Sequence, residues 1–290
     1  LCCALVSFAQ PASSPVSSPG PQPAVSSSMD WRSGALLLDI RFTPPQAQGL
    51  QPDSRFQAER ELEHLLPGLF LEAAVGIRYD SSRTVGDRIR ESQDLYFELS
   101  AALSEHGGPS GKQYSRLSRD LRQLEIGYRL PMYGPGGLAV PFVLHTRPYP
   151  MPRVLGFVPT RGFSGLVIDA RGQLPAHGKS TRESVRPALF PRLYDQRMNL
   201  VLSAEMCEPE YLRRWGLAAY TYQADEAAFF ERIRTTPLRT AARGVFGIHS
   251  TDLILPDDAV RRLLTREFNQ TVLRECRILI IVDPPGPATD

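Results

Sequence analysis

Phe163-Ser-Gly-Leu-Val-Ile-Asp-Ala-Arg-Gly172 is the stretch of the sequence that decides the fold. It is a short apolar run bounded by glycines, which predicts a buried strand. A matching run, Arg277-Ile-Leu-Ile-Ile-Val-Asp283, follows after several further helix and strand patterns. A separate set of helix and strand patterns precedes Phe163. We therefore expect two mixed layers of helices and strands, with the second built around these two strands.

The length and composition are those of a folded protein. The chain has 290 residues, of which 42% are hydrophobic and 22% are charged, so two domains can each bury a core. The formal net charge of +2 gives no electrostatic case for binding nucleic acid. Outside the N-terminal run, the cysteines are Cys207 and Cys276, which match no metal-binding spacing. Two unrelated buried thiols are the favoured interpretation, with a single disulfide as the alternative.

The N-terminal segment predicts export. Residues 1–9 resemble the end of a secretory signal, with an apolar run and small residues before Gln10. A lipoprotein signal ending at Cys2 or Cys3 is the second interpretation. Residues 10–28 are almost entirely Pro, Ser, Ala, Gly and Gln, which predicts a flexible tether. We expect a periplasmic protein, with membrane association through the N-terminus as a further option.

The first domain is expected over residues 29–150. Its predicted elements are a strand at 34–42, a helix from Ser54 to Val75 that Pro67-Gly68 kinks or interrupts, and a helix at 89–103. Residues 121–130 and 138–144 are expected to form a hairpin. This order predicts an SHS2-like arrangement, in which helices pack on an antiparallel sheet.

The second domain is expected over residues 151–290, because the alternating prolines of Arg147 to Arg153 break regular structure. Short paired strands are predicted at 187–195 and 198–202, and a strand at 238–246 that continues at 248–255 past a bulge. Helices are predicted at 208–215, 224–233, 257–268 and 271–276. The predicted fold class is therefore α+β, with two mixed α/β-layer domains.

Reactive groups do not converge anywhere in the sequence. Gly172 to Thr181 approaches a phosphate-binding P-loop, but five residues rather than four separate its glycines, and Pro187 soon follows. Asp169 and Arg171 are better interpreted as a structural ion pair than as a catalytic one. Asn269 fits a glycosylation pattern in or beside a predicted helix, which we interpret as chance. No catalytic residue, metal ligand or cofactor is predicted.

Several motifs together resemble a bacterial envelope family, the FlgP-type flagellar basal-disc proteins and related small outer-membrane lipoproteins. The resemblance lies in residues 79–87, 163–172, 186–195, 251–264 and 277–283. It implies an exported, non-enzymatic protein with an α+β domain that assembles into rings or discs around a flagellar motor. It implies no catalytic residues.

Protein–protein contact is the function that these features predict, with the protein itself and other flagellar or envelope proteins as partners. Arginine and aromatic side chains are enriched at interface centres, so two segments are candidate contact surfaces. The candidate interface residues are Arg147, Tyr149, Arg153, Tyr211, Arg214, Trp215 and Tyr222. One alternative is an envelope ligand- or peptidoglycan-binding protein. The other is an enzyme, either nucleotide-dependent through Lys179 in the Gly172–Thr181 loop or hydrolytic through Asp169.

Overall fold

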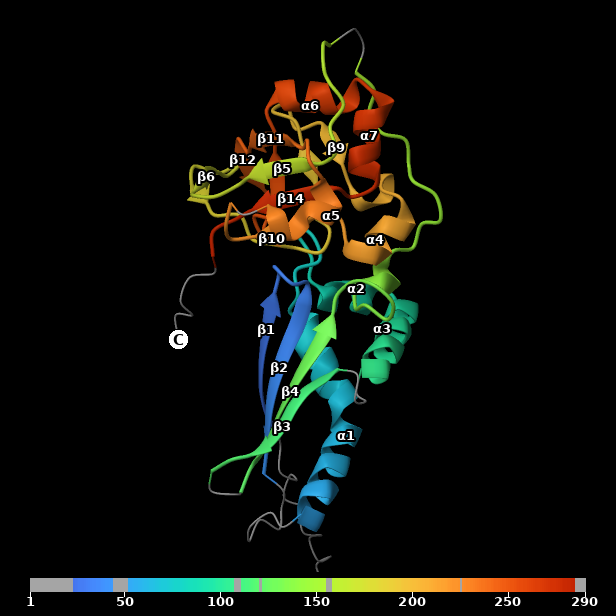
Figure 1. The fold of residues 1–290 in the computed structure, drawn as a ribbon, viewed down its shortest axis with the longest axis vertical. Coiled ribbons are helices and arrows are strands. Elements are labelled where there is room, and N and C mark those ends of the chain that lie inside the picture. The colour runs from blue at the N-terminus through green and yellow to red at the C-terminus, as the bar shows by residue number, and fades with distance from the viewer. Residues whose placement is uncertain are drawn as a thin grey trace, which may run out of the picture.

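The structure has two lobes arranged end to end. It is a computed structural model that describes residues 23–43, 52–106, 111–119, 122–154, 158–224 and 226–284. The N-terminal part of the chain forms a narrow lobe and the C-terminal part a broader one, shown below and above in Figure 1. Both lobes combine helices with sheets, which confirms the predicted α+β fold with two domains. The predicted signal remnant lies outside the described residues.

The first domain is an antiparallel sheet covered by helices on one face (Figure 1). The strand order is β1-β2-β4-β3, and the elements are β1 (Ala24–Asp30), β2 (Ala35–Phe42), β3 (Lys112–Leu117), β4 (Leu124–Pro131), α1 (Pro52–Val75), α2 (Val85–Glu91) and α3 (Gln93–His106). Alternate residues of β2 and β4 are buried under the helices, as the two-residue period of a strand requires. Among the described residues, no helix of this domain covers the other face of the sheet.

Helix α1 overturns the predicted interruption at Pro67-Gly68, because the helix continues through Pro67 to Val75. A proline inside a helix costs about 3 kcal/mol through its missing N–H and its ring. The stripe Leu62, Leu66, Phe70 and Ala74 is almost completely buried on both sides of Pro67. Each large apolar side chain contributes about 1.5–3 kcal/mol on burial, so the stripe outweighs the proline.

Three further predictions in this domain were wrong. The predicted tether ends in β1, whose residues 24–30 pair with β2 from Ala24↔Arg41 to Asp30↔Ala35. The predicted helix at 89–103 is divided between α2 and α3, because Ser92 is extended and its Oγ accepts from Leu95 N at 3.4 Å. Residues 138–144 form no strand, because β4 already lies between β2 and β3, and they contain the short 3-10 helix η1 (Val140–Phe142).

The second domain contains the two strands singled out in the sequence, side by side. Strand β5 (Leu166–Asp169) pairs in parallel with β14 (Ile278–Ile281), from Leu166↔Ile278 to Asp169↔Ile281. The full order is β10-β14-β5-β11, with β10 (Ala219–Thr221) and β11 (Leu238–Ala241) on the outside, and every pair is parallel. Strand β14 is fully buried and lies between β10 and β5, as expected for the centre of a parallel sheet.

A second sheet and four helices complete this domain. The sheet order is β12-β13-β8-β9, formed by β12 (Gly244–Phe246), β13 (Asp252–Ile254), β8 (Leu193–Tyr194) and β9 (Leu200–Leu202). The helices are α4 (Pro209–Trp215), α5 (Phe230–Ile233), α6 (Asp257–Leu264) and α7 (Glu267–Arg274), with the 3-10 turns η2 (Ala204–Met206) and η3 (Ala227–Phe229). In Figure 1, α4 and α5 lie on the side of this domain that faces the first one.

The predicted strand at 238–246 is in fact two strands in different sheets. The chain leaves the parallel sheet after β11, and β12 then pairs with β13. Gly247, at a φ of +98°, turns the chain after β12, so residues 248–255 do not continue one strand past a bulge. The predicted pairing of strands 187–195 and 198–202 is limited to β8 and β9, at the end of the first segment. Residues 187–190 contact the first domain instead.

Candidate functional site

The motif at residues 79–87 forms a tight turn closed by Asp80. The Asp80 side chain is buried, and its Oδ1 accepts from Ser82 N and Arg83 N, each at 2.9 Å. Its Oδ2 accepts from Arg83 Nη2 at 2.6 Å and Nε at 3.0 Å. Burial pushes the pKa of Asp80 upward, but the bonds from Arg83 and the backbone N–H groups hold it below its ordinary value.

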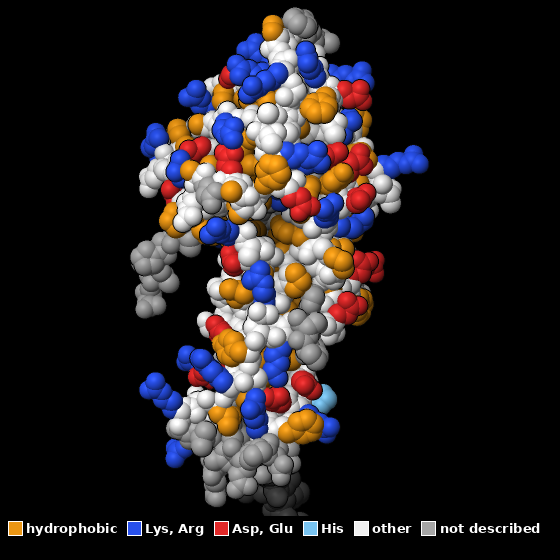
Figure 2. Space-filling model, viewed as in Figure 1, with side chains coloured by type: hydrophobic (Ala, Val, Ile, Leu, Met, Phe, Trp, Pro, Cys, Tyr) orange, Lys and Arg blue, Asp and Glu red, His pale blue; other side chains and the backbone are white. Residues whose placement is uncertain are grey.

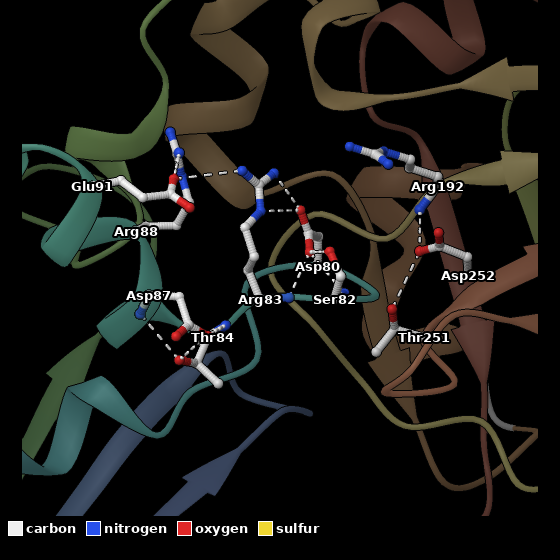
Figure 3. Close-up of polar contacts among 10 residues, drawn as sticks. All are labelled: Asp80, Ser82, Arg83, Thr84, Asp87, Arg88, Glu91, Arg192, Thr251 and Asp252. Atoms are coloured by element: carbon white, nitrogen blue, oxygen red, sulfur yellow. Dashed lines mark hydrogen bonds and ion pairs between the residues drawn. The ribbon is translucent and has the colours of Figure 1, made fainter.

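The same turn starts helix α2 through a capping box. Thr84 N donates to Asp87 Oδ2 at 2.7 Å, and Asp87 N donates to Thr84 Oγ1 at 3.2 Å. Figure 3 shows Arg83 lying between Asp80 and Glu91, with Arg88 also directed at Glu91. These contacts fix the direction in which the turn leaves the first domain.

The turn enters the second domain and bonds to it through the backbone. Leu189 N donates to Arg78 O at 3.0 Å, Phe190 N to Tyr79 O at 2.9 Å, and His249 N to Ser81 O at 2.9 Å. Gly247 lies so close that a Cβ on it would be 2.2 Å from the Cβ of Ser81. Two domains that exchange backbone hydrogen bonds cannot separate without leaving these groups to be satisfied by water.

A buried carboxyl lies on the second-domain side of this contact. Asp252 is fully buried, and its Oδ1 accepts from Arg192 N at 3.0 Å and from Thr251 Oγ1 at 3.2 Å (Figure 3). Burial raises the pKa of Asp252 above its ordinary value. The carboxyl therefore positions the loop before β8 and is not exposed for chemistry at the surface.

A second contact between the domains is made by the loop that follows β4. Gly134 N donates to Arg213 O at 2.8 Å, and Arg213 Nη2 donates to Val143 O at 2.8 Å. The Tyr133 ring packs against Gly216, where a Cβ would lie 2.3 Å from the ring carbon Cζ. Burial raises the pKa of Tyr133 to about 12, so its hydroxyl stays protonated at neutral pH.

Trp215, at the end of α4, is surrounded by guanidinium groups. Arg214, Arg232 and Arg277 each lie within 4.8–5.8 Å of a Trp215 ring centre, and Tyr211 packs against the same ring at 5.6 Å. Trp215 Nε1 donates to Glu275 O at 3.2 Å. The indole is thereby fixed in orientation, with guanidinium groups packed on its ring.

A cavity of about 350 Å³ opens between the two domains, beside Trp215. Its walls come from the β1–β2 turn, the end of β4, α4, β10 and α5. The side chains that matter chemically are Trp31, Arg32, Arg129, Tyr133, Arg214 and Trp215. We call this the junction cavity. In Figure 2, hydrophobic side chains appear at the narrow level where the two lobes meet.

The structure brings together only part of the predicted interface. Arg214 and Trp215 line the junction cavity, and Tyr211 contacts Trp215. Arg147, Tyr149 and Arg153 lie on the segment that connects the domains, all exposed, and Tyr149 is 60% exposed. Tyr222, after β10, is half-buried against the core and does not reach the cavity lining.

The sequence reasoning missed Trp31, Arg32, Arg129, Tyr133 and Arg232. The sequence signal for Trp31 and Arg32 was an adjacent tryptophan and arginine shortly before a predicted strand. In the structure the chain turns there at Gly34, which has a φ of +61°. For Tyr133 the signal was a Tyr-Gly-Pro-Gly-Gly turn. Neither signal identifies the partner from the other domain.

The remaining sequence candidates have structural partners. Lys179 Nζ contacts Glu183 Oε1 at 2.9 Å, and the loop forms a small hairpin of β6 (Leu174–Pro175) and β7 (Arg182–Glu183) where a P-loop would begin a helix. Arg171 Nη2 contacts Asp169 Oδ2 at 2.6 Å, which confirms the ion pair. The hydrogen bonds that Arg171 donates to the Asp169 carboxylate lower the pKa of Asp169.

Asn269 is a buried structural residue. Its Oδ1 accepts from Phe163 N at 2.9 Å, and its Nδ2 donates to Arg161 O at 3.0 Å and Arg262 O at 2.9 Å. These bonds attach the segment before β5 to helices α6 and α7. A buried amide with three such bonds is not accessible for glycosylation.

Cys207 and Cys276 are both free, buried thiols. Burial raises the pKa of the Cys207 thiol, and the neighbouring Cys276 raises it further. The expectation of buried thiols is therefore confirmed, but the two are neighbours rather than unrelated. Within the described residues, no group of three His, Cys, Asp or Glu side chains is arranged to hold a metal ion.

Two comparisons relate the chain to known proteins. Residues 22–134 match a family model described as Treponema pallidum Tp0624, N-terminal domain, and residues 165–284 match the model of the second domain of Tp0624. The chain is thus similar, over both domains and in the same order, to a bacterial (spirochete) protein family. Neither match is to the FlgP-type family specifically. No curated protein matches the sequence.

Proposed function

We propose that this protein is a non-enzymatic structural or assembly protein of the bacterial envelope that acts through protein–protein contact. The observation that supports the proposal is the junction, where the two domains share backbone hydrogen bonds and one hydrophobic core cluster. Such a junction suits a rigid spacer that holds two binding surfaces at a constant separation. A hinge between domains would instead contain few bonds across it.

Exposed apolar side chains on the connecting segment support a contact surface there. Leu144 is 63% exposed and Tyr149 is 60% exposed, and both lie on the segment that leads from the first domain to the second. Large apolar groups in solvent mark candidate interaction sites when they occur near one another. Tyr149 N donates to Glu205 O at 2.7 Å, so the backbone that presents this ring is fixed.

Self-association is the first test of the proposal. Analytical ultracentrifugation of the purified protein should show oligomers that form as concentration rises, and the double variant Leu144→Ser, Tyr149→Ser should weaken them by about tenfold or more. Ile248→Ser is the matched control, because Ile248 is 73% exposed but lies after β12, in the second domain. A monomer at all concentrations, with no envelope partner in crosslinked cells, would contradict the proposal.

The flagellar basal region is the setting that we propose for this activity, with export to the periplasm. The support is the resemblance of residues 79–87 and 163–172 to FlgP-type proteins, together with the match to a bacterial family. Of the helices in the described residues, none has both the length and the apolar character needed to cross a bilayer. Electron cryotomography of a deletion strain should show a ring, disc or collar missing from the motor, and an unaltered motor would contradict this setting.

A further inference from the structure

The junction cavity carries an excess of positive charge. Four arginines contribute to its lining, namely Arg32, Arg129, Arg214 and Arg232, against a single carboxylate, Glu231. Glu231 pairs with Arg214. Within the described part of the chain, neither Arg32 nor Arg129 has an ion-pair partner. Two guanidinium groups from the first domain are therefore uncompensated at the cavity wall.

Arg232 adds a buried charge to the same place. It is 7% exposed, and its guanidinium donates to Cys276 O at 2.7 Å, Trp215 O at 2.9 Å and Gly216 O. These acceptors are neutral carbonyl oxygens, and in the described residues no carboxylate contacts Arg232. A buried charge without a counter-ion is costly, so an anion next to it is strongly favoured.

Aromatic rings form the other part of the wall. Trp31 and Trp215 come from different domains, and Tyr133 and Phe229 also contribute to the lining. The volume of about 350 Å³ is within the range of small-molecule sites. Rings and aliphatic groups contribute apolar contact, while guanidinium forks recognise carboxylate and phosphate oxygens in pairs.

We propose that the junction cavity is a binding site for a small anionic molecule whose carboxylate or phosphate group is held by Arg32 and Arg129 and whose flat apolar part lies against Trp31 and Trp215. The ligand would contact both domains at once. The site can be tested separately from the self-association surface on the connecting segment, because neither Leu144 nor Tyr149 lines the cavity.

The tryptophans themselves report on the site. The chain has two tryptophans, and both line the cavity, so intrinsic fluorescence measures this location directly. Benzoate and phenyl phosphate, titrated at constant ionic strength, should each change the emission saturably in the millimolar range expected for such small probes. Benzamide has nearly the same shape as benzoate without the charge, and it should bind at least tenfold more weakly. The ratio of the two anions distinguishes a carboxylate site from a phosphate site.

Variants separate the site from a general charge effect. Arg129→Gln and Arg32→Gln should each weaken benzoate or phenyl phosphate binding about tenfold or more, because each removes a charge-assisted hydrogen bond. Arg41→Gln is the matched control on the same helix-free face of the sheet, and it should leave binding unchanged. Equal binding of benzoate and benzamide, no saturable change with either anion, or an equal loss in all three variants would overturn the proposal. Circular dichroism establishes that each variant is folded.

Discussion

Gly216→Ala tests whether the Tyr133 contact holds the two domains together. Gly216 has a φ of +76° and a ψ of 174°, a region that is nearly exclusive to glycine and costs another residue about 1–3 kcal/mol. The added methyl would also lie 2.3 Å from Tyr133 Cζ, and overpacking of this kind costs about 1–3 kcal/mol. The expected loss in the free energy of unfolding is therefore about 2–6 kcal/mol, a large part of the stability of a domain.

A matched glycine separates these two contributions. Gly178 has a φ of +78°, and nothing lies within 4 Å of a Cβ placed there. Gly178→Ala should therefore show a backbone cost of about 1–3 kcal/mol without the steric one. In a Tyr133→Ala background the ring is absent, so Gly216→Ala should cost less than in the parent protein by about 1–3 kcal/mol.

Urea unfolding followed by tryptophan fluorescence is the assay, because Trp215 is adjacent to Gly216 in the chain. Calorimetry adds a second readout, since loss of the contact should divide one cooperative transition into two. The reasoning fails if Gly216→Ala and Gly178→Ala cost the same, or if the cost of Gly216→Ala is unchanged when Tyr133 is alanine.

Asn269→Ala should lower stability by about 2–4 kcal/mol, because it leaves the Phe163 N–H and two carbonyls unpaired, and an unchanged urea midpoint would contradict this. The pKa of Asp80 is lower in the folded protein than in the unfolded chain, so its carboxylate contributes stability above about pH 4 that is lost as the pH falls through the folded-state pKa. The unfolding free energies of the parent and Asp80→Asn should therefore converge between about pH 5 and pH 2. A constant difference would argue against the pairing with Arg83. Alkylation of Cys207 and Cys276 by iodoacetamide should be slower in the folded than in the unfolded protein by on the order of a hundredfold or more, as mass spectrometry would measure, and equal rates would contradict their burial.

Elements whose signal is local were predictable from the sequence. The runs at 163–172 and 277–283 are apolar without interruption, which is the pattern of strands buried on both faces, and they prove to be the neighbours β5 and β14. Helix α4 was predicted through Glu208-Pro-Glu, and it begins at Pro209. In these cases the residues that determine the element lie within the element.

Features that depend on distant partners were not predictable in the same way. Residues 187–190 have the pattern of a strand, but their backbone groups pair with residues 78–79 of the other domain. Pro67 would end an isolated helix, whereas burial of Leu66 and Phe70 against the sheet carries α1 through it. Local propensity is a weak guide where tertiary contacts supply more free energy than it does.

The candidate site likewise contains some residues that the sequence identifies locally and others that only the fold brings together. Arg214 and Trp215 were identified because aromatic and arginine side chains occur together in one helix. Trp31 lies in the β1–β2 turn, and Arg129 and Tyr133 lie at the end of β4 and just after it. All three are distant from Trp215 in the sequence, so only the fold places them at the same cavity. The excess of arginine in the cavity is invisible in a net charge of +2.

The position of β14 has a consequence for biosynthesis. Of the strands in the described residues it is the last to be made, yet it occupies an interior place in the parallel sheet, between β10 and β5. A nascent chain that stops before Ile278 leaves β5 and β10 with no neighbour between them. We expect this domain to stay loose and unassembled until Ile278–Ile281 has left the ribosome, a delay that would suit the export we propose, because a secretion channel accepts unfolded polypeptide.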